Sequence, residues 1–186
     1  FDAFFKIQQF KDDFFQKLSF PFKKGGTILD VGCGDGSDGE IFKKKFKLKV
    51  YGMDVYEHEN IKKLEIFFKK GSVYKIPYEA NRFDYVFIHD VLHHLDESKQ
   101  KEKKIIVALQ ELRRVCKRGG YVIVAEGNRY NPLFFPHMVL LRGHNHFTQL
   151  AFCLLIRQVF HHDKISFGFF EAQFLLPDFF PREDHI

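Results

Sequence analysis

Four glycines and three aspartates crowd residues 30–39, which read D-V-G-C-G-D-G-S-D-G. Glycine has no Cβ, so this backbone can turn sharply and a ligand can approach it closely. The last three glycines fit the dinucleotide pattern G-x-G-x-x-G, which alone is a weak signal. The aspartates place negative charge where a pyrophosphate would lie, so they favour a cationic group such as a sulfonium or an α-ammonium. A turn without a ligand would need only one or two glycines, and we therefore interpret the segment as a ligand-binding turn. The residues are Gly32, Gly34, Gly36 and Gly39 with Asp30, Asp35 and Asp38.

A further aspartate, Asp54, follows the apolar segment 48–53 and lies 20 residues beyond Gly34. Its carboxylate offers two adjacent acceptor oxygens, which can accept hydrogen bonds from both hydroxyls of a ribose. The alternative role is a cap for a helix that starts near Tyr56. The spacing favours ribose binding, but it does not distinguish a nucleoside from a dinucleotide cofactor.

Histidines supply the candidates for proton transfer. His89 and Asp90 follow the apolar segment 83–88 and are expected to line the ligand pocket. His93 and His94 come directly after them, and a neutral imidazole can accept a proton near pH 7. For both, a packed or helix-starting histidine is the favoured alternative. His94 is retained as a candidate general base, and His144 is a second candidate.

These side chains need strands and helices that bring them together. Short apolar runs predict strands, and apolar residues at three- and four-residue steps predict helices. Strands are expected at 28–31, 48–53, 66–70, 83–88 and 121–125, with closing strands at 165–170 and 174–176. Helices are expected at 1–18, 40–46, 57–64, 97–116 and 149–160. Thr148 is expected to cap the last helix, and Gly119 and Gly120 to end the helix 97–116 in the C′ role.

The segment 126–147 leaves the fifth predicted strand and is expected to select the substrate. Its residues 133–141, L-F-F-P-H-M-V-L-L, are apolar but too few to span a bilayer. Three roles stay open for them: a lid over the substrate, an interfacial segment that touches a membrane, and an ordinary buried helix. His137, His144 and His146 lack the spacing of a known metal site such as H-E-x-x-H, so we predict no metal.

The composition is typical of one globular domain, with 45% hydrophobic and 28% charged residues in a chain of 186. A net charge of +5 is compatible with nucleic acid as a partner but does not require one. Cys33, Cys116 and Cys153 have neither zinc nor disulfide spacing, which favours a reduced, cytoplasmic protein. No signal peptide and no transmembrane run is recognisable. Because the chain begins at Phe1 rather than Met, we expect that residues can precede it.

The segment L-D-V-G-C-G-D-G, residues 29–36, closely resembles the first motif of class I S-adenosylmethionine (SAM)-dependent methyltransferases. Three further passages resemble the same family in order: I-P-Y (76–78), F-D-Y-V with V-L-H-H-L (83–95) and E-L-R-R-V-C-K-R-G-G (111–120). The resemblance implies a three-layer αβα sandwich around a Rossmann-like, mostly parallel sheet of seven strands. The implied strand order is 3-2-1-4-5-7-6, with the last strand antiparallel and stunted in this chain.

The resemblance also implies which residues bind SAM. The glycine turn and Asp30 would cradle the methionine and ribose parts, with His89 near the methionine part. Asp54, beside Val55, would hold the ribose hydroxyls, and the turn at Ser72 would contact the adenine. The family commonly has an acidic residue where Ser72 stands, which weakens that one contact. The implied cofactor-binding set is Asp30, Gly32, Cys33, Gly34, Asp54, Val55, Ser72, Val73 and His89.

The implied function is methyl transfer from SAM to an unidentified acceptor, and residues 133–141 favour a small apolar or amphipathic molecule. An Asn/Asp-Pro-Pro-aromatic run, usual in methyltransferases that act on base amines, is absent after residue 88, which disfavours nucleic acid. One alternative is a non-catalytic SAM-binding subunit. The other is an NAD-dependent oxidoreductase, for which the sequence holds no Y-x-x-x-K.

We expect one methyltransferase domain in four parts. Residues 1–26 would form a link and an N-terminal helix, which either packs on the core or acts as a lid over the cofactor. Residues 27–125 would be the cofactor-binding core, 126–160 the substrate-side cap, and 161–186 a terminal hairpin and tail.

Overall fold

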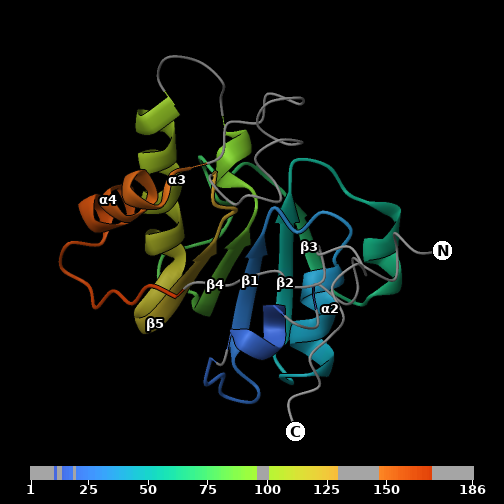
Figure 1. The fold of residues 1–186 in the computed structure, drawn as a ribbon. Helices are drawn as coiled ribbons and strands as arrows, with labels where there is room; N and C mark the ends of the chain where they lie inside the picture. Colours follow the sequence, from blue (N-terminus) through green and yellow to red (C-terminus); the bar gives the residue numbers. More distant parts are fainter. Residues whose placement is uncertain (1–10, 12–13, 19, 96–100, 130–146, 169–186) are drawn as a thin grey trace, which may run out of the picture.

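The computed structural model describes residues 11, 14–18, 20–95, 101–129 and 147–168, and these include a five-stranded parallel sheet (Figure 1). The strand order is β3-β2-β1-β4-β5. The order reverses between β1 and β4, as predicted, and it places the loops that follow β1 and β4 side by side. The strands are β1 (Thr27–Val31), β2 (Lys49–Asp54), β3 (Phe67–Lys70), β4 (Phe83–His89) and β5 (Cys116–Ala125).

Helices cover both faces of the sheet, which confirms the three-layer αβα architecture (Figure 1). On one face lies α2 (Ser37–Lys44), which follows the glycine turn directly. On the other face lie α3 (Lys101–Val115) and α4 (Gln149–Val159). Two short 3-10 helices, η1 (Glu59–Lys63) and η2 (Leu92–His94), follow β2 and β4. The predicted cap of α4 is confirmed, because the Thr148 hydroxyl accepts a hydrogen bond from the Ala151 N–H at 3.2 Å.

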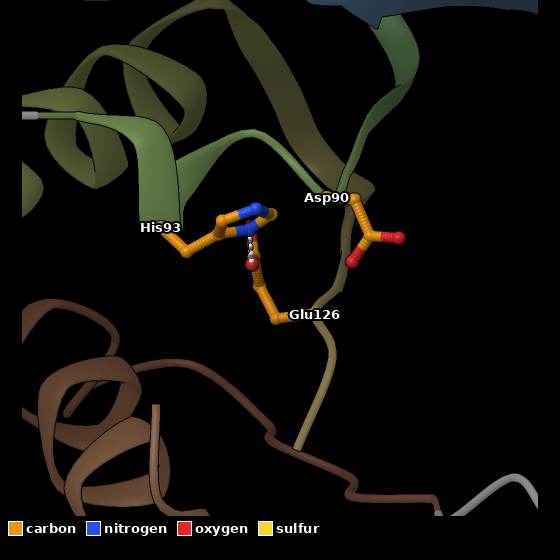
Figure 2. Close-up of side chains that lie close together, drawn as sticks. All are labelled: Asp90, His93 and Glu126. Carbon is orange, nitrogen blue, oxygen red and sulfur yellow. Dashed lines mark hydrogen bonds and ion pairs between the residues drawn. The ribbon is translucent and has the colours of Figure 1, made fainter. Parts of the chain in front are cut away.

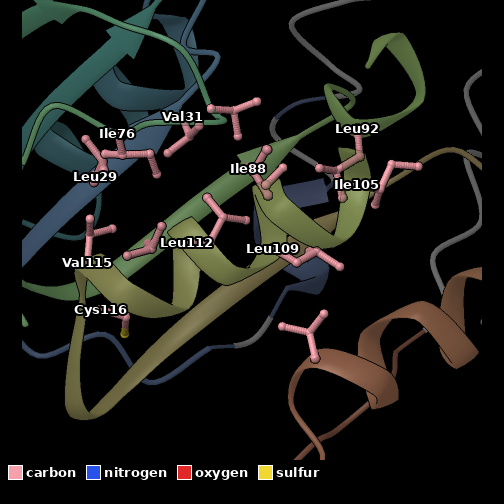
Figure 3. Packing of buried hydrophobic residues seen from close by; sticks show 14 of the residues in the cluster. Leu29, Val31, Ile76, Ile88, Leu92, Ile105, Leu109, Leu112, Val115 and Cys116 are labelled. Carbon is pink, nitrogen blue, oxygen red and sulfur yellow. The ribbon is translucent and has the colours of Figure 1, made fainter. Parts of the chain in front are cut away.

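Alternating side chains in the central strands fill two cores, one on each face of the sheet. Ile28 joins an aromatic core with Phe15, Phe42 and Phe87, so many of the abundant phenylalanines are structural. Its neighbour Leu29 points the other way, into the core beneath α3 and α4. Figure 3 shows that core, in which α3 turns its apolar stripe toward the strands. The stripe residues are Ile105, Leu109, Leu112 and Val115, all 2% exposed or less.

The structure corrects the predicted helix 57–64 and the predicted boundary between the helix 97–116 and the strand 121–125. The segment 57–64 is not an α-helix but the 3-10 helix η1, and its cap is the His58 imidazole, which accepts from the Asn60 N–H at 3.2 Å. The helix 97–116 ends at Val115 and β5 begins at once at Cys116. Gly119, with φ +74°, therefore lies within β5 rather than at a helix C′ position. The register of β5 shifts between its pairs with Phe83 and Tyr85, and a left-handed glycine is a usual residue near such an irregularity.

The predicted sixth strand is wrong over its described part, because residues 165–168 form no strand. The sheet of the described residues thus has five strands rather than seven. The predicted seventh strand at 174–176 and the apolar segment 133–141 lie outside the described residues. Of the predicted helix 1–18, residues 11 and 14–17 are described and are helical. Within the described part of the chain, no helix is long and apolar enough to cross a membrane.

One carboxylate fastens three strands at the end of the sheet opposite the glycine turn. Asp84 Oδ2 accepts hydrogen bonds from the N–H and the hydroxyl of Thr27, both at 2.8 Å, which ties β4 to β1. Its Oδ1 accepts from Lys117 Nζ at 2.7 Å, which adds β5. Burial acts to raise the pKa of Asp84, but the bonds from Lys117 and Thr27 outweigh it and lower the pKa to about 2.

We expect Asp84→Asn to lower the free energy of unfolding by about 1 kcal/mol near neutral pH, because a charged acceptor is lost at a partly exposed site. Because the pKa of Asp84 is lowered in the folded state, its ionised carboxylate stabilises the fold at pH values above the ordinary pKa of 3.8. This stabilisation fades as the pH falls toward 2. The difference between variant and wild type should therefore shrink in acid. Denaturant unfolding at a series of pH values measures it.

The control is Asp163→Asn, which removes a surface ion pair with Arg113 at 2.9 Å and should cost less than about 0.5 kcal/mol. A loss at Asp84→Asn that stays constant from neutral pH to acid would show that its charge does not fasten the strands.

Candidate functional site

All five strands are parallel, so their carboxyl ends and the loops that follow them meet at one edge of the sheet. The pairing register brings Val31 beside Met53 and Ile88, and His89 beside Ala125. The glycine turn, Asp54, the turn at Ser72 and the turn after β4 therefore lie around one place. This is the arrangement in which open α/β sheets bind ligands.

The glycine turn is held against β2 by its backbone. The N–H groups of Gly32 and Cys33 both donate to the Met53 carbonyl, at 2.7 and 3.1 Å. Gly32 has φ +72°, and a Cβ at this position would lie only 2.4 Å from Cγ2 of Val91. Two features therefore require glycine at position 32: its left-handed backbone conformation and the close approach of the turn after β4. Gly36, with φ +82°, precedes the first residue of α2.

The carboxylate of Asp54 lies directly against the glycine turn. Its Oδ2 accepts a hydrogen bond from the Gly34 N–H at 2.9 Å, and its Oδ1 accepts from the Val55 N–H at 2.7 Å. The structure thus brings Asp54, Gly34 and Val55 together, as a shared site requires. Val55 is 60% exposed, so its side chain is open to a ligand at this edge.

The turn at Ser72 lies next to Asp54, because the Gly71 N–H donates to the Asp54 carbonyl at 2.9 Å. The Ser72 hydroxyl accepts from the Tyr74 N–H at 3.3 Å, so it shapes its own turn. Val73 is 7% exposed and packs in the core beneath. The structure therefore brings Ser72 and Val73 to the site, and their contact with adenine stays a prediction.

A cluster of buried charge lies on the other side of the glycine turn. Asp38 Oδ2 bonds His89 Nδ1 at 2.9 Å, and its Oδ1 pairs with Lys11 Nζ at the same distance. Asp30 is 3% exposed, and among the described residues its Oδ2 has no hydrogen-bond partner. Phe14 stacks on the His89 ring with centroids 4.7 Å apart. Lys11 and Phe14 thus bring the N-terminal helix over the site, and its role as a lid stays a prediction.

The pKa shifts in this cluster follow from burial and from the mutual charges. Burial, and then the charge of Asp38, raise the pKa of Asp30 well above its usual value. Burial acts to lower the pKa of His89, but the hydrogen bond and charge of Asp38 outweigh it and raise the pKa. Burial likewise opposes ionisation of Asp38, yet His89 and Lys11 lower its pKa. His89 and Asp38 therefore favour the charged forms of one another, whereas Asp30 favours its neutral form.

The turn after β4 holds a second cluster, which the sequence did not predict (Figure 2). His93 Nδ1 lies 2.8 Å from Oε2 of Glu126, the first residue after β5. His93 is buried, which agrees with a packed histidine, whereas His94 is exposed and its ring lies 3.9 Å from that of His93. The only available sequence signal was positional: β4 and β5 are neighbours, so the residues that follow them meet. The second candidate base, His144, lies outside the described residues.

Asp90, His93 and Glu126 offer ligand atoms within 4.8 Å of one another, a spacing that could hold a metal ion. Their hydrogen bonds argue against that use. Glu126 Oε1 accepts from the N–H groups of Val91 and Leu92, at 3.1 and 2.6 Å, while its Oε2 bonds His93. Asp90 Oδ1 accepts from the Gly127 N–H at 3.0 Å. Three of the four carboxylate oxygens in this cluster thus already bond protein groups.

A cavity of about 560 Å³ lies between the segment 69–82 and the end of α3. It contains none of the predicted cofactor residues. One of its cations is already paired, because Arg114 bonds both oxygens of Glu111, at 2.6 and 2.7 Å. We therefore place the functional site at the carboxyl ends of the strands.

Known proteins resemble the chain over its core. It is 35% identical over 141 residues to an uncharacterized methyltransferase of Schizosaccharomyces pombe, covering 65% of this chain and 48% of that protein. A demethylmenaquinone methyltransferase of Bacillus mycoides is 30% identical over 115 residues, 56% of this chain and 46% of that protein. The chain thus spans about half the length of these relatives.

A similar solved structure is a SAM-dependent methyltransferase of Thermotoga maritima, described as a possible histamine N-methyltransferase, with a TM-score of 0.66 and 22% identity. The match covers 86% of this chain and 75% of that one, and at this identity it supports the fold. The family model of the methyltransferase domain matches residues 29–124, which is more than half of the chain. On this match, with the fold and the glycine turn at its carboxyl edge, the chain belongs to the class I SAM-dependent methyltransferases.

Proposed function

We propose that the chain transfers the methyl group of SAM to a small apolar or amphipathic acceptor. The observation that carries the proposal is the carboxylate of Asp54, which lies 2.9 Å from the Gly34 N–H where the glycine turn meets β2. A ribose at this edge would meet two carboxylate oxygens beside a backbone that carries no side chain. The buried acidic cluster lies at the other side of the same turn, where it suits the cationic end of the cofactor.

Each cofactor residue has a distinct proposed role. SAM supplies an electrophilic methyl group when it is bound. Asp54 would accept hydrogen bonds from the ribose hydroxyls, with Val55 beside it, and the turn at Ser72 and Val73 would contact the adenine. The turn Gly32–Gly34 would line the methionine part with its backbone. Burial raises the pKa of the Cys33 thiol far above its usual value, so Cys33 would contribute through its backbone and its packing rather than as a nucleophile.

The acidic cluster would face the α-ammonium group of the methionine part. Asp30 and Asp38 carry the acidic groups, and His89 and Lys11 offset part of their charge. A cation at this place would favour the ionised form of Asp30 and donate to its Oδ2, which has no hydrogen-bond partner among the described residues. We therefore expect cofactor binding to complete the hydrogen bonding of this cluster.

Methyl transfer is an in-line displacement, in which the acceptor atom bonds to the methyl carbon while the carbon–sulfur bond breaks and its electron pair stays on sulfur. The chain must hold the three atoms in line and exclude water. A base is needed only where the acceptor atom carries a proton. His94, exposed beside the site, is the described candidate, and His144 remains a candidate from the sequence.

Two observations support an apolar or amphipathic acceptor. The substrate-side segment contains the apolar residues 133–141, and a relative of the chain is named a demethylmenaquinone methyltransferase. Peripheral contact with a membrane through 133–141 is compatible with such an acceptor.

All three cysteines are free, which suits a reducing compartment such as the cytoplasm.

We expect Asp54→Ala to weaken SAM binding at least about tenfold, because the variant removes two charged acceptor atoms at the ribose position. Isothermal titration calorimetry with SAM and S-adenosylhomocysteine measures the affinity. Asp84→Asn is the control, since it also removes a carboxylate that accepts a backbone N–H, but at the opposite end of the sheet.

Equal SAM affinity in wild type and Asp54→Ala would remove the ribose role from Asp54. Binding of NAD in place of SAM would contradict the cofactor itself. Binding of SAM without release of S-adenosylhomocysteine in the presence of any acceptor tested would favour the non-catalytic SAM-binding subunit.

A second prediction concerns Gly32. Gly32→Ala should abolish measurable SAM binding, because its Cβ would collide with Val91 at 2.4 Å and displace the turn after β4. Gly25→Ala is the matched control: Gly25 also has a positive φ, +82°, but no atom lies within 4 Å of its added Cβ. Both variants should lose about 1–2 kcal/mol of stability through the left-handed backbone. Comparable SAM affinity in the two variants would show that the contact with Val91 does not shape the site.

A further inference from the structure

The turn after β4 is fastened to the exit of β5 by several hydrogen bonds. The Asp90 N–H donates to the Ala125 carbonyl at 2.9 Å, and Asp90 Oδ1 accepts from the Gly127 N–H at 3.0 Å. Asp90 adopts φ +52°, a strained conformation for a residue with a side chain, which these bonds hold in place. The bonds join the loop beside the cofactor to the segment expected to select the acceptor.

Glu126 is the centre of this arrangement. Its side chain is 1% exposed, and it accepts hydrogen bonds from the N–H groups of Val91 and Leu92 and from the His93 ring. A buried carboxylate is costly unless donors surround it, and removing it would leave three donors without an acceptor. Glu126 therefore specifies one conformation of residues 91–93.

This conformation reaches both halves of the site. On the cofactor side, the Val91 side chain covers Gly32 so closely that a Cβ on Gly32 would not fit. On the acceptor side, the ring of His94, the candidate base, lies against the ring of His93, 3.9 Å between centroids. A shift of residues 91–93 would therefore move both the Val91 side chain, which lies over the glycine turn, and the candidate base His94.

We propose that Glu126 is a positioning residue for methyl transfer, which locks the turn after β4 against the glycine turn and fixes the tautomer of His93. The inference rests on the proposed function. An ionised Glu126 accepts at both oxygens, so the His93 Nδ1 that bonds it carries the proton, and the His93 Nε2 then faces away from Glu126. Carboxylate-oriented imidazoles are held in one tautomer in this way.

The test is the variant Glu126→Gln, which keeps the size of the side chain but replaces one acceptor oxygen by a donor NH₂. If the amide oxygen stays on Val91 and Leu92, the NH₂ group faces His93, which must then accept at Nδ1 and carry its proton on Nε2. We expect the ¹⁵N imidazole spectrum to show this change of tautomer for His93 at mildly alkaline pH. We also expect the Kd for S-adenosylhomocysteine to rise about fivefold to tenfold, although Glu126 is not among the residues proposed to bind the cofactor.

Glu111→Gln is the matched control. Glu111 also accepts a backbone N–H, from Ile76 at 2.8 Å, and pairs with Arg114, but it lies on the face of α3 away from the glycine turn. The Glu111→Gln variant should be less stable than wild type, but its affinity for S-adenosylhomocysteine and its His93 signal should be unchanged. This comparison separates a positioning role from general destabilisation. Thermal unfolding of both variants checks that they fold. If Glu126→Gln does not fold, His93→Leu removes one donor only and is expected to raise the same Kd.

The outcomes separate this inference from the proposed function. If wild type and Glu126→Gln bind S-adenosylhomocysteine equally and the His93 tautomer is unchanged, the positioning role alone is overturned. Wild type that binds neither SAM nor its product overturns the proposed function and the role together. Mn²⁺ or Zn²⁺ could instead bind tightly to wild type and shift the His93 signal. If Glu126→Gln abolishes that binding, Glu126 is a metal ligand and the proposal is overturned. A changed tautomer together with a raised Kd supports it.

Discussion

β1 (Thr27–Val31) pairs in parallel with a strand on each side, β2 and β4, and the geometry of the site depends on this double pairing. Because the strands run in the same direction, the three residues that end them come together, and so do the loops that follow. The bond from the Gly34 N–H to Asp54 crosses from the first loop to the second. The bond between Asp38 and His89 joins the first turn of α2 to the last residue of β4. An antiparallel β2 would rule out the first bridge, and an antiparallel β4 would rule out the second.

The glycine turn alone does not determine the site, because the turn after β4 fits over it. Val91 occupies the space that a side chain on Gly32 would need, and the bonds of Glu126 hold Val91 there. The residue type at position 32 and the conformation at position 91 therefore constrain each other. This coupling gives a physical reason why a glycine-rich turn and a particular turn three strands later in the sequence occur in the same chain.

The sequence predicted those features that depend on neighbours along the chain. The strands, the glycine turn and the place of Asp54 follow from apolar runs, from the freedom of glycine and from spacing. It did not predict pairs whose members lie far apart in the sequence, such as Asp38 with His89 and His93 with Glu126, because a spacing of 33 or 51 residues carries no periodic signal. The start of β5 was predicted at residue 121 rather than 116, because Gly119 has the residue type of a helix end but lies in the irregular first part of β5. The strand predicted at 165–170 had the right composition, yet strand formation requires a partner edge, which composition does not supply.

The charges around the glycine turn bear on which ligand it accepts. Asp30, Asp38 and Asp54 bring three carboxyl groups to one turn, against Lys11 and His89. The raised pKa of Asp30 shows that this environment already opposes further negative charge. A pyrophosphate would add such charge beside buried carboxylates, whereas an ammonium and a sulfonium would relieve it. Burial is the main cause of the raised pKa of Asp30, and the charge of Asp38 adds to it. The same charge of Asp38 favours a cationic cofactor over a dinucleotide, although the glycine pattern itself fits both.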